Sequence, residues 1–149
     1  MTASLPSKGR LVGIDFGTVR IGIAISDAEH RLASPYENST CRDREADGQY
    51  FVELVAAENV VGFVVGLPVH GSGEESAKSL EAREFGRWLA ALTALPVTFY
   101  DERYTTAQAA QLLNTAELTS KRRKKRLDMV AAQIILASYL AVSYTHLRA

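Results

Sequence analysis

The sequence predicts one α/β domain, built on a mixed β-sheet that begins with antiparallel strands and carries helices on both faces. Two short apolar runs near the N-terminus, joined by a brief turn, are typical of an antiparallel hairpin. Helical and strand-like apolar spacings then alternate along the rest of the chain. With 149 residues, 47% of them hydrophobic, the chain is long enough for one domain with a substantial core and too short for two large lobes.

The first elements are predicted from the two-residue period of a β-strand. An apolar run leads into Asp15, and isoleucines alternate with small residues over residues 21–26. Because a parallel pair of strands needs a crossover of about a dozen residues, the turn over residues 16–19 predicts antiparallel neighbours. A weaker third strand over residues 31–39 contains Pro35, which favours the edge of the sheet.

The later elements alternate between helix and strand. Apolar residues at helical spacing precede a continuous run that is rich in β-branched side chains, which indicates a helix followed by a buried strand. A segment rich in glycine follows, and the alternation then repeats. We expect, in order, a helix over 45–58, a strand over 60–65, a loop over 66–73, a helix marked by 85–92, a strand over 97–102, a helix over 105–113 and a last helix that begins near residue 127.

One domain is expected, because no repeat, linker or low-complexity segment divides the chain. We assign this domain to residues 9–142. Residues 1–8 are expected to form a flexible N-terminal lead that carries no secretory signal. Residues 143–149 continue no periodic pattern, so we treat them as a tail of doubtful origin and give them no function.

Charge and cysteine content exclude several kinds of site. The 17 Lys and Arg residues balance 17 Asp and Glu residues, so the chain has no overall field that attracts a polyanion or a membrane. One cysteine cannot form an internal disulfide, and three scattered histidines lack the spacing of a zinc site. No apolar run approaches the roughly 20 residues of a membrane helix. We therefore expect a cytoplasmic protein that does not bind membranes.

Carboxylates stand at the ends of three predicted elements. Asp15 ends the first strand, Asp101 and Glu102 end the strand over 97–102, and Asp128 begins the last helix. Strand alternation allows only one of Asp101 and Glu102 to share a face with Asp15. Structural alternatives remain open for each acid: a cap on the hairpin turn, an ordinary surface ion pair at the strand end, and an N-cap on the helix.

Three acids gathered from two strand ends and one helix are what two-metal phosphodiester hydrolysis requires. Burying an isolated carboxylate costs several kcal/mol even after relaxation, so each of these side chains needs a partner or a metal. Carboxylate oxygens are the preferred ligands of Mg²⁺ and Mn²⁺, and two such ions about 3.5–4 Å apart activate a water and stabilise the leaving oxygen. The spacing in the sequence is compatible with this arrangement.

Six consecutive cations precede the last helix. If they enter its first turn they oppose the helix dipole, so stability disfavours them there. Contact with a nucleic-acid backbone is the functional interpretation, and a solvated basic loop is the common alternative. The six residues are Lys121, Arg122, Arg123, Lys124, Lys125 and Arg126.

Four separated motifs resemble those of the YqgF/RuvX family. They are Asp15-Phe-Gly-Thr-Val-Arg-Ile-Gly-Ile-Ala-Ile-Ser-Asp27, Gly66-Leu-Pro68, Asp101-Glu-Arg-Tyr-Thr-Thr106 and Asp128-Met-Val-Ala-Ala-Gln-Ile-Ile-Leu136. Their order and spacing agree with the family over residues 9–141, and four motifs in sequence are far more specific than any one of them. The loop after Pro68, which contains His70, departs from the family because it is shorter and lacks an Asp before its glycine.

The resemblance implies an RNase H-like fold and a metal-dependent nuclease that uses Mg²⁺ or Mn²⁺. Asp15, Glu102 and Asp128 match the family's metal-binding acids, whereas Asp101 would have a supporting or structural role. The implied activity is processing of the 5′ end of pre-16S rRNA in ribosome biogenesis, with resolution of Holliday junctions as the alternative. Association with the ribosome would suit the first activity, and a homodimer would suit symmetric cutting of a junction.

Two arginines also match motif positions of the family. Arg20 and Arg103 stand where a guanidinium could hold a phosphate through two hydrogen bonds or form a structural ion pair.

Two other classes of function compete with the nuclease. Asp-x-Gly-Thr followed by a hairpin is also how actin-like ATPases and sugar kinases open their phosphate-binding domain, although those folds close a second lobe over the nucleotide. The third class is an RNA-binding module without catalysis.

Overall fold

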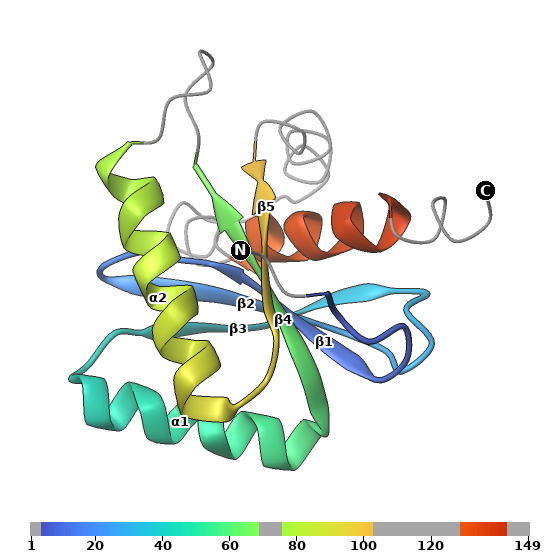
Figure 1. The fold of residues 1–149 in the computed structure, drawn as a ribbon, viewed down its shortest axis with the longest axis horizontal. Helices are drawn as coiled ribbons and strands as arrows, with labels where there is room; N and C mark the ends of the chain where they lie inside the picture. Colours follow the sequence, from blue (N-terminus) through green and yellow to red (C-terminus); the bar gives the residue numbers. More distant parts are fainter. Residues whose placement is uncertain (1–3, 69–75, 103–128, 143–149) are drawn as a thin grey trace, which may run out of the picture.

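The computed structural model describes residues 4–68, 76–102 and 129–142 (Figure 1). Five strands form one sheet in the order β3-β2-β1-β4-β5. Strand β2 pairs antiparallel with both β1 and β3, whereas β4 runs parallel to both β1 and β5. Residues 129–142 are helical. The other elements are β1 (Arg10–Asp15), β2 (Arg20–Ser26), β3 (Ala33–Thr40), α1 (Arg44–Glu58), β4 (Val60–Leu67), α2 (Ala77–Thr93) and β5 (Val97–Asp101).

The antiparallel half of the sheet follows the predicted pattern. In the β1–β2 hairpin Val12 pairs with Ile25 and Asp15 with Gly22, so the turn brings Asp15 to the end of its strand. Strand β3 lies at the edge of the sheet, where Pro35 pairs with Ala24 beside a register shift. Proline donates no backbone hydrogen bond, and an edge strand with an irregular ladder tolerates this. The hairpin and the edge position of the third strand are confirmed.

Both labelled helices begin at side-chain caps. The Asp43 carboxylate accepts a hydrogen bond of 2.8 Å from the Ala46 backbone N–H and starts α1. Ser76 starts α2 by accepting a hydrogen bond of 3.2 Å from the Ser79 N–H. The Ser76 hydroxyl also donates a hydrogen bond of 3.2 Å to the Pro68 carbonyl oxygen. This second bond ties the beginning of α2 to the end of β4.

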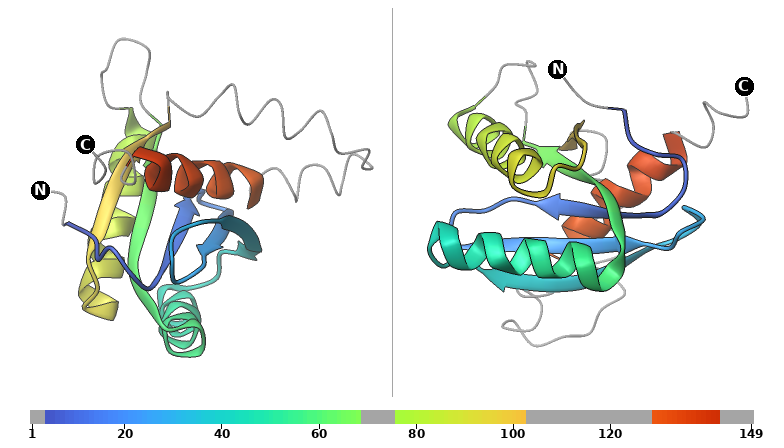
Figure 2. Two further views of the ribbon diagram at one scale, coloured as in Figure 1. Left: turned by 90° about the vertical axis from the view of Figure 1, so that its right-hand side faces the viewer. Right: turned by 60° about the horizontal axis from the view of Figure 1, so that its bottom comes forward.

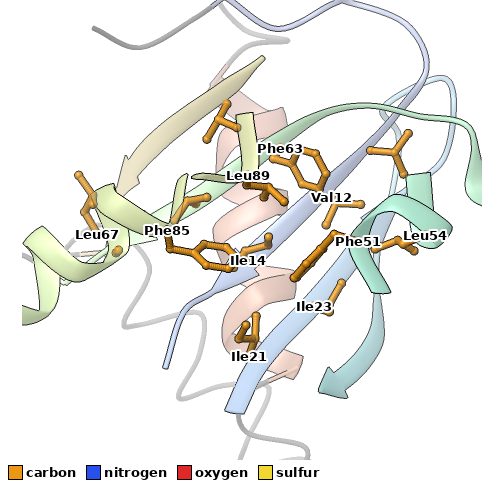
Figure 3. Packing of buried hydrophobic residues seen from close by; sticks show 14 residues of the cluster. Val12, Ile14, Ile21, Ile23, Phe51, Leu54, Phe63, Leu67, Phe85 and Leu89 are labelled. Carbon is orange, nitrogen blue, oxygen red and sulfur yellow. The ribbon is translucent and has the colours of Figure 1, made fainter. Parts of the chain in front are cut away.

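Helices cover both faces of the sheet, as Figure 2 shows from two further directions. Helices α1 and α2 pack on one face over the larger core cluster, whose members in Figure 3 include Val12, Ile14, Ile23, Phe51, Phe63, Phe85 and Leu89. The helix over residues 129–142 packs on the other face, over a smaller cluster that comprises Leu11, Ala24, Val64, Ala132, Ile135, Leu136 and Leu140. Successive side chains of a strand point to opposite faces of the sheet, so the neighbours Leu11 and Val12 belong to different clusters.

Some predicted boundaries are wrong by one or two residues. Gly66 and Leu67 belong to β4 rather than to the following loop, because they continue the parallel ladder with β5. Strand β5 ends at Asp101, and Glu102 lies in a 3₁₀ turn just beyond it. The predicted helix over 105–113 and the tail over 143–149 lie outside the described residues. In the described part of the chain no helix is long and apolar enough to cross a membrane.

Candidate active site

The parallel register brings Asp15 and Glu102 to one edge of the sheet. Strand β4 lies between β1 and β5, with Val65 beside Ile14 and Gly66 beside Tyr100. The carboxyl ends of the three strands are therefore level, and Asp15 and Glu102 stand at the ends of the outer two. In open α/β sheets the carboxyl edge of parallel strands is where ligands commonly bind.

Gly66 allows the glutamate to pack across the middle strand. A methyl group on Gly66 would lie 2.5 Å from Ile135 Cδ1 and 2.9 Å from Glu102 Oε1. A methyl group on Gly13, two residues before Asp15 on β1, would lie 2.9 Å from the Ala132 backbone oxygen in the helix over 129–142. Because alternate residues of a strand share a face, both acids belong to the face that this helix covers.

Burial raises the pKa of the Glu102 carboxyl group, and the nearby charge of Asp101 raises it further. A hydrogen bond between the side chains of Glu102 and Asp15 acts in the opposite direction and lowers this pKa. Ionisation of both carboxyl groups in such contact costs free energy, because like charges at close range repel. A divalent cation would remove that cost, so the donor set fits Mg²⁺ or Mn²⁺.

The two acids line an open pocket of about 580 Å³. Its wall also includes the β1–β2 turn over residues 16–19 and Arg20, which was predicted to contact phosphate. Lys78 and Glu81, from the first turns of α2, complete the charged lining. The sequence analysis missed these two residues. The available signal was their spacing of three residues at the start of a helix, which places both side chains on one helical face.

Several predicted site residues lie outside the described part of the chain. They are His70, Arg103, Asp128 and the six cations of residues 121–126. Residue 128 directly precedes the first described residue of the last helix, in which Ala132, Ile135 and Leu136 are buried. Within residues 4–68, 76–102 and 129–142, the candidate acids amount to a pair, and no group of three or more potential ligands is present there.

Asp27, the last residue of the first motif, has a structural role. Its carboxylate accepts hydrogen bonds from the backbone N–H groups of Arg31, at 2.7 Å, and Leu32, at 3.0 Å. The bond from Leu32 is the main reason why the pKa of Asp27 lies below its ordinary value. Asp27 thus closes the turn between β2 and β3, at the opposite end of the hairpin from Asp15.

We expect Gly66→Ala to disturb the site more than the fold. The added methyl group must displace Ile135 or Glu102, and overpacking of this kind typically costs about 1–3 kcal/mol of unfolding free energy. Moving the Glu102 carboxylate should also lower the cleavage rate about 10-fold or more. Initial rates and thermal melts of the purified variant measure both effects.

Gly62→Ala is the matched control for this substitution. Gly62 lies on the same strand, but its methyl group would meet Leu5 and Leu11 at 3.0 and 3.2 Å, away from the acids. This variant should lose stability while retaining the parental rate. A folded Gly66→Ala protein that cleaves as fast as the parent would contradict the placement of Glu102.

Comparison with known proteins identifies the family. A family model described as "RuvX: Holliday junction resolvase" matches residues 9–142. A relative from Rhodopirellula baltica is 47% identical over 135 residues, which cover 91% of this chain and 78% of the relative. A second relative, from Rhodobacter capsulatus, is 40% identical over 138 residues, which cover 93% of this chain and 87% of the relative. Both relatives carry the name "Putative pre-16S rRNA nuclease".

Solved structures share the fold at low sequence identity. RuvC of Thermus thermophilus, in complex with a Holliday junction substrate, has a TM-score of 0.59 and 15% identity and covers 91% of this chain and 96% of its own. A yeast mitochondrial Holliday junction resolvase has a TM-score of 0.59 and 14% identity and covers 93% of this chain and 80% of its own. These likenesses confirm the predicted RNase H-like fold. The match over residues 9–142 and the two relatives show that the chain belongs to the RuvX family.

Proposed function

We propose that this chain is a metal-dependent endonuclease that processes the 5′ end of pre-16S rRNA. The observation that carries the proposal is the contact between Asp15 and Glu102, two carboxyl groups from separate strands, at the wall of an open pocket. The family supports nuclease chemistry. The names of its curated relatives support RNA as the substrate. They also favour this activity over the nucleotide-binding and non-catalytic alternatives.

The acidic and the basic side chains have different parts in the proposed reaction. Asp15, Glu102 and Asp128 would hold the metal ions through their carboxylate oxygens. Bound Mg²⁺ or Mn²⁺ supplies a Lewis acid that activates water and stabilises the leaving oxygen. Arg20 and Lys78 line the same pocket and provide cationic donors for the phosphates that flank the scissile bond.

The substrate is tested by a cleavage assay that compares two nucleic acids side by side. Precursor 16S rRNA and a four-way DNA junction are incubated with the chain, with and without Mn²⁺. Preferred, metal-dependent cleavage of the RNA near the mature 5′ end supports the proposal. Preferred cleavage of the junction would instead support resolution of Holliday junctions, the activity in the family description.

The cellular setting follows from the proposed substrate. A protein that processes precursor rRNA acts in the cytoplasm and meets its substrate on assembling ribosomal particles, so we propose both the location and an association with those particles. A homodimer would be required only for symmetric cutting of a junction. Sedimentation of the chain with and without RNA distinguishes the two assembly states.

The six cations of residues 121–126 are proposed to contact the RNA backbone. Neutral replacement of Arg122, Arg123, Lys124 and Lys125 should weaken RNA binding and flatten its salt dependence, by about 0.7–0.9 in log–log slope for each lost phosphate contact. Binding isotherms at several salt concentrations measure this slope. Arg87→Gln, at an exposed position of α2 outside the active-site pocket, serves as the control and should leave the slope unchanged. An unaltered slope in the fourfold variant would show that these cations do not contact the RNA backbone.

A further inference from the structure

A second pocket, of about 280 Å³, adjoins the active-site pocket. The two share Phe16, Thr18 and Glu81, so they are separated only by the β1–β2 turn and one residue of α2. Beyond this boundary the second pocket continues between the start of α1 and the middle of α2. Nothing in the proposed metal chemistry uses it.

Aromatic rings form one side of this second pocket. The ring centroids of Phe16 and Phe85 are 4.7 Å apart, and those of Phe85 and Trp88 are 5.5 Å apart. The Arg44 guanidinium lies 5.0 Å from the centroid of the Trp88 ring. Flat rings and a guanidinium plane are the surfaces on which proteins stack unpaired bases of single-stranded nucleic acid.

The charged groups of the pocket favour a base over a phosphate. Arg42 and Arg44 are outnumbered by Asp47, Glu81 and Glu84, and an excess of carboxylates repels a phosphate. The Asp47 carboxylate already accepts hydrogen bonds of 3.0 and 3.3 Å from the Arg42 backbone N–H. Glu84 is exposed on α2 and lines this pocket but not the active-site pocket. It is therefore the carboxylate available to a ligand held here.

We propose that this pocket binds one unpaired nucleobase of the RNA strand, with guanine preferred. The inference rests on the proposed function, because it assumes that the neighbouring phosphodiester backbone lies in the active-site pocket. Guanine presents N1–H and N2–H donors that a carboxylate such as Glu84 accepts. Its O6 and N7 atoms accept hydrogen bonds from a guanidinium, here that of Arg44. Uracil lacks the amino group and so satisfies the carboxylate less well.

The chain carries its own probes for this pocket. Trp88 is the only tryptophan and Cys41 the only cysteine, and both line the pocket. Short RNAs that differ at one unpaired position (guanine, uracil or an abasic ribose) are titrated against the full chain in EDTA, so that no cleavage occurs. We expect saturable quenching of Trp88 fluorescence, with guanine binding about 10-fold or more tightly than uracil. The abasic RNA should give little quenching.

Protection of Cys41 gives a second readout. Burial raises the pKa of the Cys41 thiol, and the charge of Asp47 raises it further, so alkylation is followed at alkaline pH. RNA with guanine at the test position should slow this alkylation more than the abasic RNA. Equal quenching and equal protection by the guanine and abasic RNAs would overturn the proposal, because contact would then come from the backbone.

Glu84→Gln tests the choice of base. An amide cannot accept both guanine donors, so the preference for guanine over uracil should fall by about 10-fold. Glu53→Gln is the matched control, because it removes the same charge from an exposed position of α1 outside the pocket. An unchanged preference in Glu84→Gln would refute the assigned contact.

The outcomes separate this inference from the proposed function. Base-dependent quenching in a chain that cleaves no RNA would support the nucleobase pocket and overturn the nuclease proposal. Metal-dependent cleavage without base-dependent quenching would overturn the pocket and leave the nuclease intact.

Discussion

Asp15→Asn is expected to abolish Mg²⁺- or Mn²⁺-dependent cleavage of RNA while the metal-free protein retains its thermal melt. The substitution keeps the shape of the side chain but removes one negative charge from the pair with Glu102. Loss of a residue that merely supports a metal ligand typically lowers activity about 10–100-fold, so loss of a ligand should lower it more than about 100-fold. Initial cleavage rates and melts in EDTA measure the two effects.

Asp27→Asn is the matched control for this substitution. Both residues are aspartates at the ends of hairpin strands, but Asp27 uses its carboxylate to accept backbone N–H groups, and an asparagine carbonyl can accept the same bonds. Asp27→Asn should therefore cleave near the parental rate. If Asp15→Asn also cleaves at the parental rate, Asp15 is not a metal ligand.

Glu102→Gln is expected to make the metal-free protein more stable at neutral pH while destroying its response to metal. Because burial raises the folded-state pKa of Glu102, the folded protein favours the protonated carboxyl group. The protonated Glu102 side chain stabilises the fold fully below the pKa that this carboxyl group has in the unfolded chain, about 4.3. This stabilisation is lost as the pH rises through the raised pKa of the folded state. A glutamine is neutral at every pH and can donate a hydrogen bond to Asp15.

Thermal melts in EDTA across a pH series test this expectation. The midpoint of Glu102→Gln should exceed that of the parent at neutral pH, and the difference should shrink as pH falls toward about 4. Added Mn²⁺ should raise the midpoint of the parent but not that of the variant, because only the parent is expected to bind the ion tightly. Glu81→Gln, at an exposed position in the same pocket, is the control and should melt like the parent in EDTA. A parental pH dependence in Glu102→Gln would contradict the raised pKa.

The elements that the sequence predicted well are those with local causes. The hairpin follows from alternation on both sides of a short turn, and the edge position of β3 follows from Pro35. Asp15 was placed correctly at a strand end for the same reason. The choice of Glu102 over Asp101 as a metal ligand came from the family resemblance and stays a prediction, although the Glu102 side chain contacts Asp15 in the structure.

The remaining features depend on contacts between distant segments. Packing of Glu102 over Gly66 requires the parallel register of three strands, which no local pattern specifies. Lys78 and Glu81 enter the site because Ser76 ties the beginning of α2 to Pro68. The second pocket, which contains Trp88, likewise forms only when α1 and α2 pack together. Such tertiary placements are fixed by packing rather than by propensity.

The most direct test is an anomalous diffraction map from a crystal of the chain soaked in Mn²⁺. We predict a manganese peak within coordinating distance of both the Asp15 and Glu102 carboxylates, with Asp128 completing the ligand set. Carboxylates that turn away from each other with no peak between them, in a crystal that contains the ion, would contradict the metal site on which the proposed nuclease depends.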